Sequence, residues 1–130
     1  MNILQAFGND ATKATQGVWV NYGDAKFKIG KLGFGNPKYK SALTSAQLTG
    51  FTEDELPRVR AEILADTIVL GWENVEFNGV AFPYTRENAV MVLSDPNLVA
   101  FLDWIESVAT KRENYALEVQ KENLAELKNV

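Results

Sequence analysis

The chain has 130 residues, of which 46% are apolar and 23% are charged, and its formal net charge is −4. This length allows one domain, and the composition is that of a globular rather than a disordered protein. Cysteine and histidine are both absent, which excludes disulfides, thiolate zinc sites and cysteine nucleophiles and removes the commonest general base and metal ligand. We therefore predict a protein that is not an enzyme and has no catalytic, cofactor or metal site.

The start of the chain, MNILQAFGND, has neither the basic nor the apolar segment of a signal peptide. No apolar run approaches the roughly 20 residues of a membrane-spanning helix. We expect a soluble, cytoplasmic protein without a membrane partner.

The charge is uneven along the chain. Residues 1–40 carry six Lys and two Asp, whereas residues 41–110 carry three Arg and eleven acidic residues. Such asymmetry favours a polar partner surface or self-association over nucleic-acid binding, which usually needs a basic domain. Ordinary solvated faces explain it equally well.

The N-terminal third predicts an arm followed by a β-hairpin. Residues 1–16 are small and polar, which is typical of a mobile arm. In residues 17–32, Gly23-Asp24 suits a two-residue turn. The resulting register places six apolar or aromatic residues on one face, as the pairs Tyr22 with Ala25, Val20 with Phe27 and Val18 with Ile29.

Two helices should follow. Asn36-Pro37 supplies an N-cap and a first-turn proline, and Gly50 ends that helix. The next helix begins in the acidic segment 54–57 and is expected to run to Leu70, because Gly71 then stops it.

Turn and cap signals divide the last 60 residues. Asn78-Gly79 predicts either a short hairpin that pairs Phe77 with Val80 or a structured loop. Thr85 caps a short helix over residues 86–93, and Asp95-Pro96 caps the last helix. A heptad spacing predicts one long final helix that projects or frays after Ala109; its positions are Leu98, Phe101, Ile105, Val108, Arg112, Tyr115 and Val119.

Together these signals predict an α+β fold that is mainly α-helical, with an N-terminal β-hairpin followed by about four helices, the last one long. The predicted divisions are an N-terminal arm (1–16), a globular domain (17–110) and a C-terminal extension of the last helix (111–130).

The residues by themselves allow three hypotheses about function. Carboxylates, at Glu73 and Glu76 or at 53–55, could perform acid–base chemistry, but acids at 53–55 also fit a helix N-terminus. Lysines interleaved with aromatic residues at 19–40 could bind single-stranded nucleic acid, although the whole protein is acidic. The stripe from Tyr115 to Leu127 could bind a partner helix or be a solvated end.

Four ordered pieces of sequence resemble the tail assembly chaperone family of long-tailed bacteriophages. They are the predicted strand pair with Leu32-Gly33 and Asn36-Pro37-Lys38-Tyr39, the segment Leu70-Gly71-Trp72-Glu73-Asn74-Val75, the turn Asn78-Gly79 with Pro83-Tyr84-Thr85, and Leu93-Ser94-Asp95-Pro96 with the helix after it. Together they span roughly residues 18–120.

The resemblance implies a non-enzymatic protein of the host cytoplasm that is absent from the mature virion. Its implied partners are the tape-measure protein, which it keeps soluble during tail tube assembly, and also tail tube subunits or further copies of itself as a homo-oligomer. Exposed apolar side chains would bind these partners; the candidates are Trp19, Phe34, Trp72, Tyr115, Val119, Leu124 and Leu127. A structural virion component, such as a minor tail or head–tail connector protein, is the main alternative, and a small carboxylate-dependent enzyme is a remote one.

Overall fold

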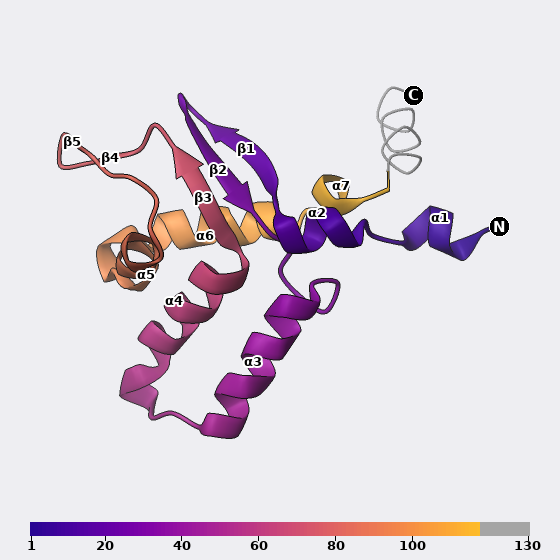
Figure 1. Cartoon of the computed structure of the whole chain (residues 1–130), viewed down its shortest axis with the longest axis horizontal. Coiled ribbons are helices and arrows are strands. Elements are labelled where there is room, and N and C mark those ends of the chain that lie inside the picture. Colours follow the sequence, from indigo (N-terminus) through magenta and orange to yellow (C-terminus); the bar gives the residue numbers. More distant parts are fainter. Residues whose placement is uncertain (118–130) are drawn as a thin grey trace.

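The computed structural model of the protein describes residues 1–117. Within them the chain forms seven α-helices, two 3-10 turns and five strands in two sheets (Figure 1). The strands are β1 (Val18–Tyr22), β2 (Ala25–Ile29), β3 (Val69–Glu73), β4 (Glu76–Phe77) and β5 (Val80–Ala81). The helices are α1 (Ile3–Phe7), α2 (Ala11–Gln16), α3 (Pro37–Thr49), α4 (Leu56–Thr67), α5 (Arg86–Ser94), α6 (Val99–Ala109) and α7 (Arg112–Tyr115), with 3-10 turns η1 (Glu53–Glu55) and η2 (Pro96–Leu98).

A three-stranded antiparallel sheet forms the centre of the fold, in the order β1-β2-β3. The β1–β2 register is the predicted one, with Val20 opposite Phe27 and Val18 opposite Ile29. Strand β3 then pairs with β2 and places Trp72 opposite Phe27. The sheet therefore joins residues about 45 positions apart, and the register between β2 and β3 shifts between Lys28 and Ile29.

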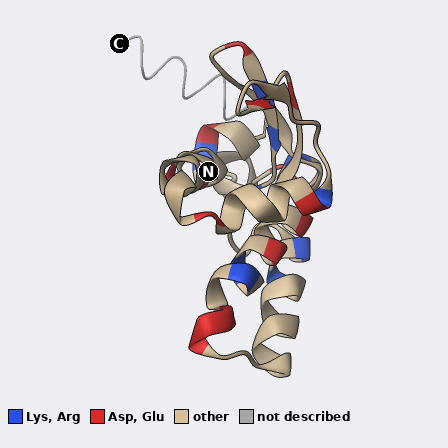
Figure 2. Ribbon diagram, turned by 90° about the vertical axis from the view of Figure 1, so that its left-hand side faces the viewer, with Lys and Arg blue, Asp and Glu red and all other residues tan. Residues whose placement is uncertain are grey.

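Helices α3 and α4 form a helical hairpin that projects from the sheet (Figure 1). The Asn36 side chain accepts hydrogen bonds from the backbone N–H groups of Lys38 and Tyr39, as an N-cap does. At the far end the acidic turn η1 lies between the two helices, and Figure 2 shows its acidic residues at the tip of the hairpin. The acids thus lie next to a helix N-terminus, where the helix dipole stabilises them.

The second sheet is a small hairpin of β4 and β5 around Asn78-Gly79. Both turn residues have positive φ, 54° and 77°, as a type I′ turn requires. Phe77 pairs with Val80 as predicted, and the Phe82 N–H donates to the Val75 carbonyl over 2.9 Å. After this hairpin, Thr85 caps α5 by accepting from the Asn88 N–H.

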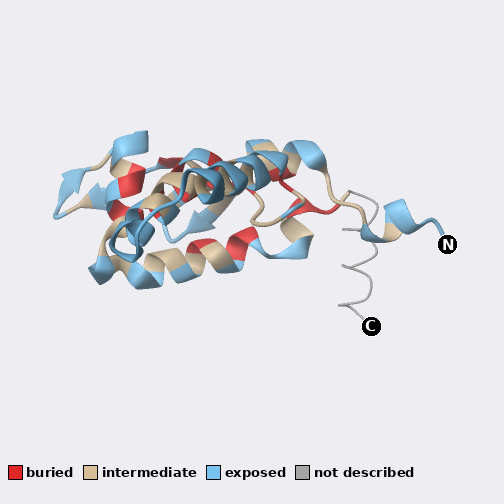
Figure 3. Ribbon diagram, turned by 90° about the horizontal axis from the view of Figure 1, so that it is seen from below, coloured by how far each residue is buried: buried red, intermediate tan, exposed pale blue. Residues whose placement is uncertain are grey.

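The core lies between the sheet and the helices around it, and Figure 3 shows the buried positions gathered in the middle of the molecule. Helix α6 packs on β2, since the Phe27 ring contacts the rings of Phe101 and Trp104 at centroid distances of 5.5 and 5.3 Å. Ile29, Ile68 and Ile105 are fully buried.

A second buried region, here called the polar corner, consists of Gly30, Asn36, Thr67 and Tyr115. The Tyr115 hydroxyl lies 3.0 and 3.1 Å from the carbonyl oxygens of Ile29 and Gly30. The Asn36 side-chain amide donates to the carbonyls of Lys31 and Thr67. A Cβ on Gly30 would lie 2.6 Å from the Thr67 carbonyl oxygen, so only glycine allows this approach.

The two ends of the described chain meet beside the polar corner. Asn9 forms a β-bridge with Ala116, and the Asp10 N–H donates to the Tyr115 carbonyl over 2.7 Å. Ala14 of α2 is fully buried. The structure thus adds ordered contacts on both sides of residues 17–110, while the division into arm, domain and extension stays a prediction.

The prediction of a mainly helical fold is wrong. Strands are interspersed with helices, two short helices precede the β1–β2 hairpin, and a third strand completes its sheet. The helix expected to reach Leu70 ends at Thr67, because residues 69–73 pair with β2 as a strand.

The prediction of a long last helix is also wrong within the described residues. Helix α6 ends at Ala109, Lys111 is extended, and a separate short helix α7 follows. Tyr115 therefore does not continue the heptad pattern on one long helix; its side chain is buried in the polar corner instead. The remaining heptad positions after Leu117 lie outside the described residues. Among residues 1–117, no helix is both long and apolar enough to cross a membrane.

Candidate partner-binding site

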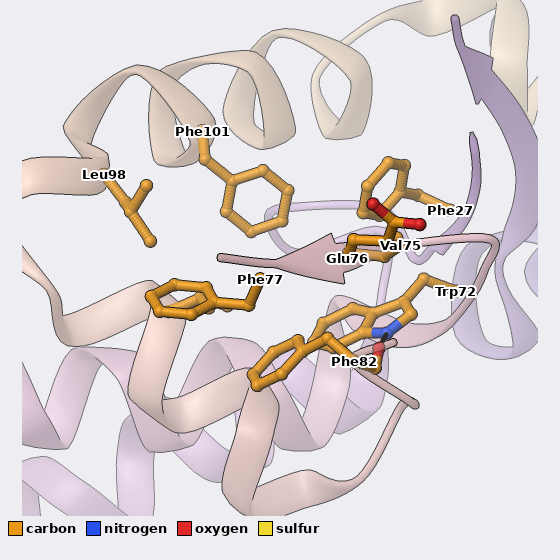
Figure 4. A pocket seen from close by; sticks show the side chains of 9 residues that line it. Phe27, Trp72, Val75, Glu76, Phe77, Phe82, Leu98 and Phe101 are labelled. Atoms are coloured by element: carbon orange, nitrogen blue, oxygen red, sulfur yellow. Dashed lines mark hydrogen bonds between the residues drawn. The ribbon is translucent and has the colours of Figure 1, made fainter. Parts of the chain in front are cut away.

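An apolar cavity opens between the β4–β5 hairpin and helix α6, and we call it the aromatic pocket (Figure 4). Its volume is about 170 Å³. Its lining residues are Phe27, Trp72, Val75, Glu76, Phe77, Phe82, Val92, Leu98 and Phe101. All but Glu76 are apolar or aromatic, so the pocket suits an apolar side chain of about the size of leucine or phenylalanine.

Stacked aromatic rings build one wall of the pocket. The indole of Trp72 stacks on Phe82 with a centroid distance of 5.7 Å and an interplanar angle of 14°. Its Nε1–H donates to the Phe82 carbonyl oxygen over 2.8 Å, which satisfies the polar atom of the indole. Phe77 lies 5.4 Å from Phe82 on the same side. The Asn78-Gly79 turn positions this wall, because it folds residues 75–82 back on themselves.

The opposite wall comes from distant parts of the chain. Phe101 projects from α6 and Leu98 from η2, and Figure 4 shows both facing Phe77 and Phe82 across the cavity. Phe27 of β2 closes the inner end and contacts Phe101. The pocket therefore exists only once the sheet, the small hairpin and α6 have packed together.

Tyr84 supports the pocket from behind. Its ring meets the Trp72 indole edge-on at 5.1 Å, and its hydroxyl donates to the Val69 carbonyl over 3.0 Å. Burial, with a smaller contribution from the carboxylate of Asp66, raises the pKa of Tyr84 above its ordinary value. The phenol therefore keeps its proton and acts as a hydrogen-bond donor rather than as a base.

The pocket is formed largely by a stretch of sequence that is acidic overall. Glu76 is the charged residue in its lining, and residues 41–110 carry three Arg against eleven acids. Each Arg already has a carboxylate partner; the pairs are Arg58–Glu62, Arg60–Glu106 and Arg86–Asp66. The eight remaining carboxylates leave this interval negative overall, and Glu76 in the lining would attract a basic group at the pocket mouth.

The lining offers little for chemistry. It contains no Ser, Thr, Tyr or Lys, so it lacks both a nucleophile and a base other than Glu76. Glu73, the other carboxylate considered from the sequence, lies opposite Lys26 in the sheet. Among residues 1–117, no group of three or more Asp or Glu side chains could hold a metal ion.

The predicted partner-binding residues fall into three groups. Trp19 and Phe34 are exposed, by 50% and 79%, and the Lys40 ammonium lies 5.8 Å from the Phe34 ring centroid. Trp72 was expected at an exposed face, but only 7% of it is exposed. Its indole is part of the hydrophobic core and also forms part of the pocket wall.

Tyr115 is also fully buried, because its hydroxyl reaches the backbone of β2 and Gly30. Val119, Leu124 and Leu127 lie outside the described residues. The structure does not bring Trp19 and Phe34 into the aromatic pocket.

Sequence reasoning missed most of the pocket. The pairing across Asn78-Gly79 already placed Val75, Phe77 and Phe82 on one face, and that was the available signal. Phe27 and Phe101 could not be assigned to the pocket, because local patterns do not show which distant segments pack together.

The chain matches the family model described as YdaY prophage protein over residues 34–126. This is therefore a protein of bacteriophage or prophage origin. Because the match covers most of the chain, we assign the protein to the YdaY prophage protein family. The matched interval contains every lining residue of the aromatic pocket except Phe27. No curated protein and no solved structure matches the chain.

Proposed function

We propose that this prophage protein is a tail assembly chaperone that binds the tape-measure protein and keeps it soluble while the tail tube assembles. The aromatic pocket is the observation that carries the proposal, because it is an open apolar cavity whose lining contains a single ionisable group, Glu76. The family match gives the protein a prophage origin, and the ordered sequence resemblance to tail assembly chaperones supports the proposed role.

A single pocket of this size suits a chaperone that must release its client. Burying one Leu or Phe side chain contributes roughly 1.5–3 kcal/mol, which is far less than a stable protein complex needs. Several such contacts along a long client would hold it in solution, and each would exchange individually. Tube subunits that bind the client more tightly could then displace the chaperone by mass action.

The carboxylate of Glu76 in the pocket lining favours a basic client segment. Glu76 lies in the lining, and the interval 41–110 is negative even after its arginines are paired. We propose that the bound segment is an amphipathic helix that inserts an apolar side chain and carries Lys or Arg beside it. Helices of this kind dock through residues spaced three or four apart.

The same proposal makes the protein non-enzymatic and places it in the host cytoplasm, outside the mature virion. Tail tube subunits and other copies of the chain are further proposed partners. Trp19 and Phe34 would extend the contact surface, since both are exposed aromatic side chains.

The test is co-expression of the protein with the tape-measure protein of its own prophage, followed by a pull-down and a measurement of the soluble client fraction. We expect the client to be soluble only with the chaperone. In the variant Phe77→Asp the pocket acquires a charge and the soluble fraction should fall. Val80→Asp is the matched control, because Val80 pairs with Phe77 across the same turn but does not line the pocket.

A second pair of variants tests the charge argument. Glu76→Lys should weaken binding of a basic segment, whereas Glu87→Lys changes the charge equally at a residue outside the pocket lining. If the client is equally soluble without the protein, the chaperone proposal is wrong. Recovery of the protein in purified particles at fixed copy number would instead establish a structural virion component.

A further inference from the structure

Strand β1 is an open edge of the central sheet. It pairs with β2 on one side and is the outermost strand (Figure 1). Tyr22 and Ala25 flank the two-residue turn and form a hydrogen-bonded pair, and such pairs alternate with non-hydrogen-bonded ones along the ladder. The backbone N–H and C=O groups of Trp19 and Asn21 therefore point away from β2, and they bond to no other group of residues 1–117.

This edge lacks the usual protection against pairing with another strand. Soluble proteins place charged residues, proline or a bulge at such edges. The sequence of β1 is VWVNY, which contains neither a charge nor a proline, and its register with β2 is continuous. Trp19 and Tyr22 are 50% and 62% exposed. At the opposite edge of the sheet, by contrast, the Tyr84 hydroxyl donates to the Val69 carbonyl of β3. The β1 edge is thus suited to accept a strand.

The sequence of β1 fits a second copy of itself. In an antiparallel pair around a two-fold axis at Val20, Trp19 of one chain faces Asn21 of the other, and both have outward-pointing backbone groups. Val20 faces its own counterpart as a non-hydrogen-bonded pair, and Val18 faces Tyr22. All five residues of the strand are then paired. Moving the axis by one residue along the strand would pair fewer of them.

Both faces of the joined sheet would be chemically continuous. On the inner face, Trp72, Phe27 and Val20 lie next to one another on β3, β2 and β1. The second copy would continue this row in reverse order from its own Val20, so that apolar side chains lie beside apolar side chains. On the outer face the new pair contains only Trp19 and Asn21, so no like charges would lie directly opposite each other.

We propose that two copies of the chain pair through β1, antiparallel and centred on Val20, and join their three-stranded sheets into one of six strands. A second copy is the favoured occupant because this register uses the outward groups of Trp19 and Asn21 and brings no charge against another. The paired strand is only about 17 Å long at 3.4 Å per residue. The interface is therefore small, as is typical of transient association.

The inference deepens the proposed function at one point, since it rests on the proposed self-association and gives it a defined interface. It does not require binding of the tape-measure protein. The tests of the dimer use the purified protein alone, so failure of the dimer and failure of client binding are separate results.

A single introduced cysteine tests the register, because the chain has none of its own. In full-length Val20→Cys the two cysteines would face each other with Cα atoms about 4.5 Å apart, which is within the range of a disulfide. Val18→Cys is the matched control. Val18 is partly buried in the same strand, as Val20 is, but it would lie about 14 Å from its counterpart, four residues along the pair. We expect Val20→Cys to form the disulfide-linked dimer at least about tenfold faster than Val18→Cys.

A proline tests the edge without cysteines. Because the Asn21 N–H points away from β2, Asn21→Pro removes an outward donor but keeps the hydrogen bonds between β1 and β2. Asn21→Ala is the control, since it keeps the N–H. In sedimentation equilibrium we expect the dissociation constant of the dimer to rise at least about tenfold for the proline variant and less than about threefold for the alanine variant. Circular dichroism checks that both are folded; if the proline variant is not, the cysteine pair decides.

Four results would overturn the proposal. The first is a parent protein that stays monomeric up to about 1 mM. Equal trapping of Val20→Cys and Val18→Cys would exclude the register, and equal dissociation constants for Asn21→Pro and the parent would place the dimer interface elsewhere. If the Trp19 and Asn21 amides gain protection from hydrogen exchange only when the tape-measure protein is added, the edge belongs to the client instead.

Discussion

The aromatic pocket and the polar corner are built on opposite principles. The pocket is lined by rings, leaves a cavity and has its one indole N–H satisfied by a neighbour ten residues away. The polar corner leaves little space, and buried polar groups join residues up to 86 positions apart in it. The pocket contains Phe27 of β2, and the polar corner lies at the end of the same strand. The two regions are therefore built on one sheet.

The difference shows what each region is suited to do. Apolar contacts are non-directional, so a ring-lined cavity can accept side chains of different shapes. Buried hydrogen bonds are costly when unmade, so a polar corner accepts one arrangement only. The molecule thus combines an adaptable apolar cavity with a buried polar region that accepts one arrangement only.

The largest effect should come from removing the indole that belongs to both the pocket and the core. Trp72→Ala should lower the free energy of unfolding by about 3–5 kcal/mol, as for other buried large-to-small changes. Trp19→Ala, at a half-exposed position, should cost less than about 1 kcal/mol. Urea unfolding followed by circular dichroism measures both. Equal losses would show that Trp72 is not part of the core.

A smaller loss should follow from removing one hydroxyl of the polar corner. Tyr115→Phe keeps the ring but leaves the carbonyls of Ile29 and Gly30 without this donor, at a cost of about 1–3 kcal/mol. Tyr22→Phe changes an exposed tyrosine and should stay within about 0.5 kcal/mol of the parent. Thermal unfolding of the two variants compares them. A neutral Tyr115→Phe would mean that water replaces the lost donor.

The smallest effect should appear at alkaline pH. Burial raises the pKa of Tyr115 above its ordinary value. Its contribution to stability is therefore complete below the unfolded-state pKa of about 10 and is lost as the pH rises above it toward the folded-state pKa. At about pH 11 the loss is roughly 1.4 kcal/mol.

The measurement compares the parent with Tyr115→Phe over this range. The difference in free energy of unfolding between them should narrow as the pH rises, because the phenylalanine variant has no hydroxyl to ionise. A constant difference would contradict a tyrosine held protonated by burial.

Local signals allowed several elements to be predicted from the sequence. The β1–β2 register, the Asn36 cap, the Asn78-Gly79 turn and the Thr85 cap each depend on residues close together in the chain, and the structure confirms them.

The predictions that were wrong share one physical cause, which is that the segments concerned pair with residues far away in the sequence. Residues 69–71 look like a helix end by composition, but pairing with β2 makes them part of a strand. Tyr115 fits a heptad seam, but its hydroxyl bonds to carbonyls at the end of β2. The same limit applies to the pocket, because its two walls come from segments that only the tertiary fold brings together.

The contacts between the two ends of the described chain also have a kinetic consequence. The Lys13 ammonium donates to the Ala116 carbonyl oxygen across 103 residues. Closing such a long loop costs more entropy than forming the hairpins, and contacts of high sequence separation slow folding. The junction of Asn9 with Ala116 should therefore form late, after the sheet and α6 have already brought its two sides together.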